Sequence, residues 1–588
     1  MAAGRAEWGS DVVVEMMQAY GMEYAMVNLG GTFRGVLDSI VNFGENKHPQ
    51  VIECLHEEIA VAVAIGYSKV TGKPAVALVH NVVGTLHASM NIYDAYVSHT
   101  PVIIMSGTGP MSQPLRRPWI DWVHTALVQG NLVRDYVKWD DQPHDAPSFP
   151  ESFVRAVRVA TTEPQGPVYI ALDAGWQEVH LEKPIELPDL SRLEAPTRLQ
   201  GDPAALHRTA ELLANAQNPV LVAGNVGRKP EAVQSLVELA EVGNFPVMDL
   251  GGGLNFPNTH RLDATGTNLL SQADVVVLLE LGAADRALTI PSRYPRGPKE
   301  TRLKAGVQVV NISLQEHFIR STMLSYGRLY PVDLNIGADT SLAIPELTQL
   351  VRAQIDGKPN QADVLSQRAQ LVEEARAAVQ RRWQQEYASK ESSTPITHAR
   401  LAQETWNVIK DDKWFLSGDA DGWLRRLWKM DRLGSVVDGG GAAGLGIGLP
   451  RSVGIGLAAK EQGGFCVSFE GDGDFLYVPT AIWTAVHHQI PVLMFVLDNG
   501  GYMGEGGHVS WTAEQRDRST ANSHVAVHIN NPRINFAGLA REQGAYAEGP
   551  IEDPNELGPA IRRAYDAMKK DSTMAVVHVR VVNQHAAG

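Results

Sequence analysis

Residues 465–503, FCVSFEGDGDFLYVPTAIWTAVHHQIPVLMFVLDNGGYM, predict a buried strand over 465–469, a polar turn, a helical stretch, and a second buried strand over 492–497. The second strand ends in another polar turn, 498–502. A helix that joins two parallel strands brings both strand ends to the same edge of a sheet. Ligands of open α/β sheets bind at that edge. The two turns are therefore expected to form one site.

The two turns carry oxygen ligands of the kind that Mg²⁺ prefers. Asp472 offers a carboxylate, Asn499 an amide oxygen, and the glycine-rich backbone at Gly501 a carbonyl group. Mg²⁺ usually takes few protein ligands and completes its shell with phosphate oxygens and water. The turns therefore predict a magnesium site beside a diphosphate, which the helix N-terminus near Gly473 could also contact.

This pattern, GDG at 471–473, then 24 residues, then an Asn-containing turn, resembles the signature of thiamine diphosphate-dependent enzymes. The family usually has two asparagines in the turn, whereas this chain has Asp498-Asn499; the second position carries the metal ligand. The resemblance implies a Mg²⁺ ion on Asp472, Asn499 and Gly501. It also implies that the cofactor lies against Gly471, Asp472, Gly473, Asp474, Asn499, Gly501, Tyr502 and Met503.

Composition limits the classes of partner. The chain has 588 residues, of which 44% are hydrophobic and 20% charged, and a net charge of −15. This charge argues against a nucleic acid or an anionic membrane as the main partner. No signal peptide and no apolar run of 18 residues is apparent, and Cys54 and Cys466 lie in apolar contexts. These features predict a cytoplasmic protein with buried, reduced cysteines.

Short apolar runs alternate with helical stretches along most of the chain, which is typical of parallel sheets covered by helices. The expected fold class is α/β, with three consecutive doubly wound domains. The three domains are expected at 1–185 (pyrimidine-binding), 195–355 (middle) and 396–588 (diphosphate- and magnesium-binding), with a helical connector at 356–395.

The segment LHEEIA at 55–60, with Gly66-Tyr67 after it, resembles a helix of the pyrimidine-binding domain in the decarboxylase and acetolactate synthase superfamily. In that family a glutamate hydrogen-bonds the aminopyrimidine ring and helps to generate the nucleophilic carbon of the cofactor. The resemblance implies this catalytic role for Glu57. The alternative is a carboxylate that only stabilises the helix start.

The glycine-rich stretch 439–450, GGGAAGLGIGLP, resembles the family loop that holds the cofactor in a bent shape. The resemblance implies that Leu445 separates the two rings and that the carbonyl group of Ala443 accepts from the pyrimidine amino group. The segment GDADG at 418–422 lies where the family contacts the diphosphate, which implies contacts from Gly418, Ala420 and Asp421. Two acids replace the usual hydroxyl or amide groups there.

His80 lies 23 residues after Glu57, in the stretch LVHNVVGT at 78–85. Within the family, this spacing is most like that of the catalytic histidine of the benzoylformate decarboxylases. A histidine there can donate to a ketone oxygen and relay protons. A structural histidine at a strand end is the alternative.

The same comparison indicates a substrate pocket, with departures from the family. Gly31 stands where the decarboxylases have a serine, His87 where relatives have an asparagine, and no histidine of the middle domain matches their second one. The candidate pocket residues are Asn28, Gly31, Thr32, Asn81, His87 and His508.

Three functions stay open at this point. The first is a lyase that acts on a 2-oxo acid or an acyloin; the second is a carboligase with an acceptor aldehyde; the third is a non-catalytic relative. FAD, which acetolactate synthases hold in the middle domain, is not supported, because the glycine turns at 30–31 and 224–227 do not complete a dinucleotide fingerprint. The resemblance implies a homodimer or a dimer of dimers, with the halves of each site on different subunits.

Overall fold

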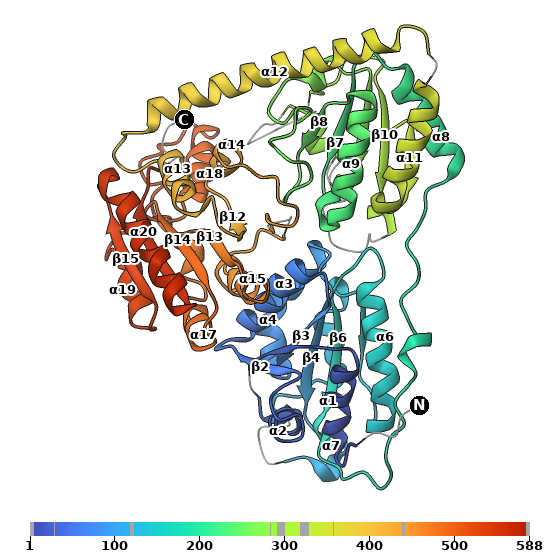
Figure 1. Ribbon diagram of the computed structural model, residues 1–588. Helices are drawn as coiled ribbons and strands as arrows, with labels where there is room; N and C mark the ends of the chain where they lie inside the picture. The colour runs from blue at the N-terminus through green and yellow to red at the C-terminus, as the bar shows by residue number, and fades with distance from the viewer. Residues whose placement is uncertain are drawn as a thin grey trace.

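Three parallel β-sheets follow one another along the chain and form three α/β domains (Figure 1). In the computed structural model, the described residues are 5–28, 30–117, 123–282, 284–290, 300–317, 329–356, 358–437 and 441–583. Every ladder between the named strands is parallel. The expected fold class is confirmed.

The first domain has a six-stranded sheet with helices on both faces. In spatial order its strands are β2 (Gln50–Glu53), β1 (Tyr24–Val27), β3 (Ala75–Val79), β4 (Val102–Thr108), β6 (Val168–Asp173) and β5 (Trp139–Asp141). Its α-helices are α1 (Gly9–Ala19), α2 (Arg34–Asp38), α3 (Glu57–Thr71), α4 (Val82–Val97), α6 (Phe149–Thr161) and α7 (Ala174–Gln177). β3 consists of apolar residues that are all buried, as expected for a strand covered on both faces.

The middle domain has a five-stranded sheet. In spatial order its strands are β11 (Leu334–Gly337), β10 (Gln308–Ser313), β9 (Val275–Leu279), β7 (Pro219–Ala223) and β8 (Val247–Asp249). Its α-helices are α8 (Pro203–Asn215), α9 (Pro230–Gly243), α10 (Ala284–Leu288) and α11 (Thr340–Ile355). A single long helix, α12 (Gln361–Lys390), then crosses from this domain to the third (Figure 1).

The third domain has the last five-stranded sheet. In spatial order its strands are β12 (Trp414–Gly418), β13 (Phe465–Gly471), β14 (Val492–Asp498), β16 (Met574–Arg580) and β15 (Tyr546–Ile551). Its α-helices are α13 (His398–Ile409), α14 (Trp423–Leu427), α15 (Gly448–Glu461), α16 (Asp472–Phe475), α17 (Ala481–His487), α18 (Met503–Glu514), α19 (Phe536–Arg541) and α20 (Pro554–Asp571). The helical stretch predicted between β13 and β14 is present as α17, which ends at His487.

Helix α3 of the first domain packs directly on α15 of the third domain. A Cβ atom at Gly66 would lie 2.1 Å from the carbonyl oxygen of Arg451, and one at Gly454 would lie 2.0 Å from that of Val63. Only glycine permits such close backbone approach. One hydrophobic core therefore runs through both domains.

Two further expectations concern single features. Cys54 and Cys466 are both buried and free, as expected. Within the described ranges, every helix is too short or too polar to cross a membrane.

Candidate active site

Strands β13 and β14 bring the two polar turns of the third domain together. Gly471 pairs in register with Leu497, so both strands end at the same level of the sheet. Asp472 follows one strand and Asn499 follows the other. The predicted juxtaposition of carboxylate and amide is therefore present at the carboxyl edge.

Asp472 is buried, and backbone groups hold its carboxylate. Oδ1 accepts from the N–H of Gly473 at 2.8 Å, and Oδ2 accepts from the N–H of Gly500 at 2.8 Å. Burial raises the pKa of Asp472 to about 6, and the neighbouring Asp498 carboxylate adds to the rise. A bound cation would offset both effects, which suits a metal ligand.

Asp498, the residue that replaces an asparagine of the family, is turned towards β16. Its Oδ2 lies 2.9 Å from Nε2 of His578, which is fully buried. Arg533 and Arg580 lie 3.8 and 3.6 Å from the same oxygen. Asp498 therefore stabilises the sheet, whereas Oδ1 of Asn499 accepts from the N–H of Gly501 at 3.2 Å.

The glycines of this turn are needed for its shape. Gly500 and Gly501 have φ values of 89° and 144°, and a Cβ atom at Gly501 would lie 2.2 Å from the carbonyl oxygen of Val527. Tyr502 reaches back so that its hydroxyl group donates to the carbonyl of Gly473 at 3.4 Å. Met503 is buried at the start of α18. The helix expected beside Gly473 is a single turn, α16, in which the N–H of Gly473 already donates to Asp472.

The glycine-rich loop lies between the first and third domains. Its Gly439 and Gly440 lie outside the described residues. The N–H of Ala442 donates to Oδ1 of Asp94 on α4 at 2.7 Å, and the N–H of Gly446 donates to Asp474. Between these anchors, Leu445 is 38% exposed, and Ala443 adopts a left-handed backbone with φ of 55°. The exposed leucine and the strained alanine are consistent with a loop shaped for a ligand.

The segment after β12 is arranged differently from the expectation. Asp419 accepts from the N–H groups of Ala420 and Gly422, at 2.8 and 2.6 Å. These N–H groups are therefore not open to a phosphate. Gly418 has φ of 75°, and Asp421 is exposed.

Glu57 is the first residue of α3 and is buried. Its Oε2 lies 3.0 Å from Nδ1 of His87 on α4. A Cβ atom at Gly84 would lie 2.7 Å from Oε1 of Glu57 and 2.8 Å from Cβ of His80. Glycine at this position thus lets helix α4 approach both predicted catalytic residues. Its neighbour Glu58 is half-buried.

His80 lies at the end of β3 and contacts two other polar side chains. Its Nδ1 is 3.4 Å from Oγ1 of the buried Thr32, and the ring of His124 meets it edge-on at 5.3 Å between centroids. Burial, and next the proximity of His124, lower the pKa of His80 below its ordinary value. This shift favours the neutral imidazole, whose N–H group can donate a hydrogen bond to a carbonyl oxygen.

The remaining predicted pocket residues differ in their burial and in their hydrogen-bond partners. Asn81 is fully buried beside His80, and neither its Oδ1 nor its Nδ2 has a partner among the described residues. Asn28 donates to the carbonyl of Cys54 at 2.8 Å, which gives it a structural role, and Gly31 is exposed with open space around its Cα. His508 is exposed on α18.

Within one chain, the start of α3 lies against the glycine-rich loop of the third domain. Glu58 lies beside Gly446: a Cβ atom there would be 2.9 Å from Oε1 of Glu58. Burial, and next the Asp474 carboxylate, raise the pKa of Glu58. The expectation that the halves of each site lie on different subunits stays a prediction.

The residues present fit thiamine diphosphate and Mg²⁺ on two grounds. Asp472 and Asn499 provide hard oxygen donors at one end. At the other end, Glu57 and Asn81 are buried, and Asn81 has an unsatisfied amide that costs free energy until a ligand pairs with it.

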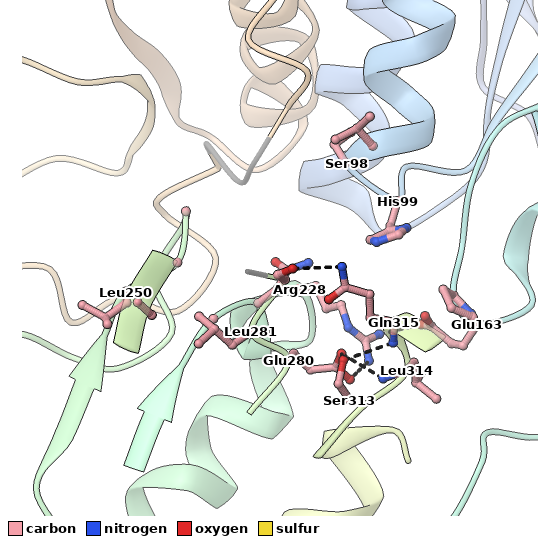
Figure 2. Close-up of a pocket in the computed structure, with 18 of the residues that line it drawn as sticks. Ser98, His99, Glu163, Arg228, Leu250, Glu280, Leu281, Ser313, Leu314 and Gln315 are labelled. Atoms are coloured by element: carbon pink, nitrogen blue, oxygen red, sulfur yellow. Dashed lines mark hydrogen bonds and ion pairs between the residues drawn. The ribbon is translucent and has the colours of Figure 1, made fainter. Parts of the chain in front are cut away.

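A separate cavity of about 630 Å³ lies between the first and middle domains (Figure 2). Arg228 lines it and pairs with Glu163, Glu280 and Asp339, at 2.8, 3.1 and 3.3 Å. Carboxylates thus surround the guanidinium group of Arg228 in this cavity, and whether FAD binds the middle domain stays open.

Sequence reasoning missed His124, Asp94 and His56. His124 and Asp94 meet the site only through tertiary packing. His56 precedes Glu57 in the sequence, but its proximity to His87 depends on the packing of α3 against α4.

Comparisons with known proteins agree with this arrangement. Residues 7–124 match the thiamine pyrophosphate enzyme N-terminal TPP binding domain, residues 206–347 the central domain, and residues 417–579 the C-terminal TPP binding domain. The chain is 23% identical over 578 residues to the acetolactate synthase large subunit of Haemophilus influenzae, covering 96% of this chain and 93% of that protein. It is 25% identical over 501 residues to the benzoylformate decarboxylase of Pseudomonas aeruginosa, covering 84% and 85%. The benzoylformate decarboxylase structure from Polynucleobacter necessarius superimposes with a TM-score of 0.76 at 20% identity, covering 98% and 99%.

Proposed function

Because the chain belongs to the thiamine pyrophosphate enzyme family, we propose that it is a thiamine diphosphate- and Mg²⁺-dependent lyase that cleaves a carbon–carbon bond next to a carbonyl group. The substrate class is a 2-oxo acid or an acyloin. The observation that carries this proposal is the placement of Glu57 and the His80–His124 pair opposite Asp472 and Asn499.

Each end of the site has its own task. Asp472, Asn499 and the carbonyl of Gly501 would hold Mg²⁺, which binds the diphosphate. Glu57 would hold a proton against the pyrimidine ring nitrogen, and the loop at Leu445 would keep the two rings bent. When bound, thiamine diphosphate supplies a nucleophilic carbon and an electron sink.

His80 and His124 supply the proton chemistry on the substrate side. The neutral imidazole of His80 can donate to the carbonyl oxygen of the substrate. Replacement of a carboxyl group by hydrogen needs one proton at that carbon, and the two histidines are suitable sources. This histidine pair favours the lyase.

A carboligase is the second candidate, and the similarity to acetolactate synthases supports it. Purified protein with thiamine diphosphate and Mg²⁺ should be assayed against a panel of 2-oxo acids, with and without an acceptor aldehyde. CO₂ release without acceptor supports the lyase; a product that needs the acceptor supports the carboligase. Failure to bind the cofactor would overturn both and favour a non-catalytic role.

A homodimer or a dimer of dimers is proposed as the active unit, from the family resemblance. Mixing Glu57→Gln and Asp472→Ala proteins under conditions of subunit exchange tests whether two copies share sites. Recovery approaching a quarter of wild-type activity would mean that first domains pair with third domains of the partner copy. No recovery is the result for sites built within one chain.

A further inference from the structure

Three side chains with metal-binding groups converge at the N-terminus of α3: His56, Glu57 and His87. One ligand atom of each lies within 4.8 Å of the others. Nδ1 of His87 is 3.0 Å from Oε2 of Glu57. The rings of His56 and His87 stack, with 4.8 Å between centroids and 24° between planes. Two imidazoles and one carboxylate, with water in the fourth position, form a common zinc ligand set.

We propose that His56, Glu57 and His87 bind a divalent transition metal ion of the Zn²⁺ class, and that this ion occupies the carboxylate that the cofactor requires. The blocking role rests on the function proposed above, whereas the metal site does not. The occupied site would hold the protein in an inactive form.

The geometry allows this ion with a small movement. Zinc bonds of about 2.0–2.2 Å place tetrahedral ligand atoms roughly 3.3 Å apart, close to the present distance between His87 and Glu57. The His87 side chain is 55% exposed and the Glu57 side chain 8%. The exposed imidazole can therefore move towards a carboxylate that packing holds in place.

His56 exchanges one interaction for another when it binds metal. It is the N-cap residue of α3, and its Nδ1 accepts from the N–H of Glu58 at 3.2 Å. A neutral imidazole has a single free lone pair, so the metal replaces this hydrogen bond. The negative charges of Glu57 and its half-buried neighbour Glu58 favour a cation at this position.

The site differs in ligand type from the proposed magnesium site. Mg²⁺ prefers oxygen ligands, whereas imidazole nitrogen suits Zn²⁺ and its neighbours in the transition series. Excess Mg²⁺ should therefore leave the cluster of His56, Glu57 and His87 free for zinc.

Metal binding is tested on the cofactor-free protein in excess Mg²⁺, by calorimetric titration with Zn²⁺ and by visible absorption with Co²⁺. One ion per chain is expected. His87→Asn and His56→Asn should each weaken binding at least about tenfold; asparagine keeps the helix cap at position 56. His207→Asn, which alters an exposed His–Glu pair on α8, is the matched control and should bind normally. Unchanged affinity in His87→Asn would overturn the metal site.

Blocking is tested by titrating thiamine diphosphate into protein with and without bound zinc. Zinc-loaded wild type should bind the cofactor at least about tenfold more weakly, and His87→Asn should show no such difference. Equal cofactor affinity in the zinc-loaded and zinc-free wild type would overturn the blocking role. Failure of the cofactor to bind any form would overturn the proposed function and the blocking role together, while the histidine variants still decide the metal site.

Discussion

Nε2 of His578 lies 2.9 Å from Oδ2 of Asp498, and both side chains are buried at the carboxyl ends of the neighbouring strands β14 and β16. Through this contact the side chain of Asp498, the first residue of the turn, stabilises the sheet. The contact gives a structural reason for an aspartate at a position where an asparagine is usual in the family. The next residue, Asn499, remains for the ligand.

Asp498→Ala should destabilise the third domain. Removing the carboxylate leaves a buried ring nitrogen of His578 without its hydrogen-bond partner, which costs about 1–3 kcal/mol. Asp498→Asn should cost clearly less, because an amide oxygen can still accept from His578. Urea unfolding of the cofactor-free protein measures both, with Asp571→Ala at the exposed end of α20 as control. Equal stability of Asp498→Ala and wild type would contradict this role.

Asp472→Ala should weaken Mg²⁺ and thiamine diphosphate binding together, by at least about tenfold, because the carboxylate is one of the few protein ligands of the metal. The fold should be retained, since the lost contacts are two hydrogen bonds at the sheet edge. Calorimetric titration of the cofactor with and without Mg²⁺ is the measurement. Normal cofactor affinity in this variant would refute the metal-site assignment.

Glu57→Gln should lower activity by about 10²- to 10⁴-fold, the usual worth of a positioned proton transfer. Cofactor binding should survive, because glutamine keeps the shape and the burial. Hydrogen–deuterium exchange at the reactive carbon of the bound cofactor should slow in parallel.

The matched control for that change is Glu58→Gln. Glu58 is the next residue on α3, and its side chain lies beside Gly446 and not at the expected position of the pyrimidine ring. The Glu58→Gln protein should exchange deuterium at the wild-type rate. Unchanged exchange in Glu57→Gln would rule out the activating role of Glu57.

His80→Ala should slow turnover but leave cofactor binding and deuterium exchange intact. If exchange fell as far as turnover, His80 would serve the cofactor and not the substrate. His124→Phe tests the partner ring, because it keeps the bulk and removes the second imidazole.

The pH dependence of activity tests the effect of His124 on the pKa of His80. Burial and then His124 lower the pKa of His80 from its ordinary value of 6.5, so neutral His80 persists below that pH. Activity that needs neutral His80 should therefore fall only below pH 6.5 in wild type. In His124→Phe the acidic limb should move up towards 6.5. By the same linkage, the contribution of neutral His80 to folding is present above pH 6.5 and is lost on acidification.

Gly454→Val should disrupt the packing of α3 on α15. Its Cβ atom would overlap the carbonyl oxygen of Val63, so the helices must separate. Stability should drop by about 1–3 kcal/mol or more, and cofactor affinity should fall because the two ends of the site are displaced. Gly504→Ala, which has open space around it, is the control. A stable Gly454→Val protein with normal cofactor affinity would contradict the interface.

Much of the fold followed from local patterns. Continuous apolar runs such as 492–497 marked strands buried on both faces, and the polar turns after them marked the edge where Asp472 and Asn499 meet. These features depend on residues close in sequence, or on the rule that parallel strands end at one edge. The role of Glu57 was implied by the family resemblance, and the structure places this residue at the start of α3.

Other features depend on which elements pack together, and no local pattern encodes that. The pairing of His80 with His124, of Asp498 with His578, and of Ala442 with Asp94 joins residues 44, 80 and 348 positions apart. The same holds for the packing of α3 against α15, which depends on the glycine contacts between these helices. The amino-acid sequence by itself indicated the candidate residues at each end of the site. Long-range packing decided which other side chains contact them, because burial and close approach arise only when the domains meet.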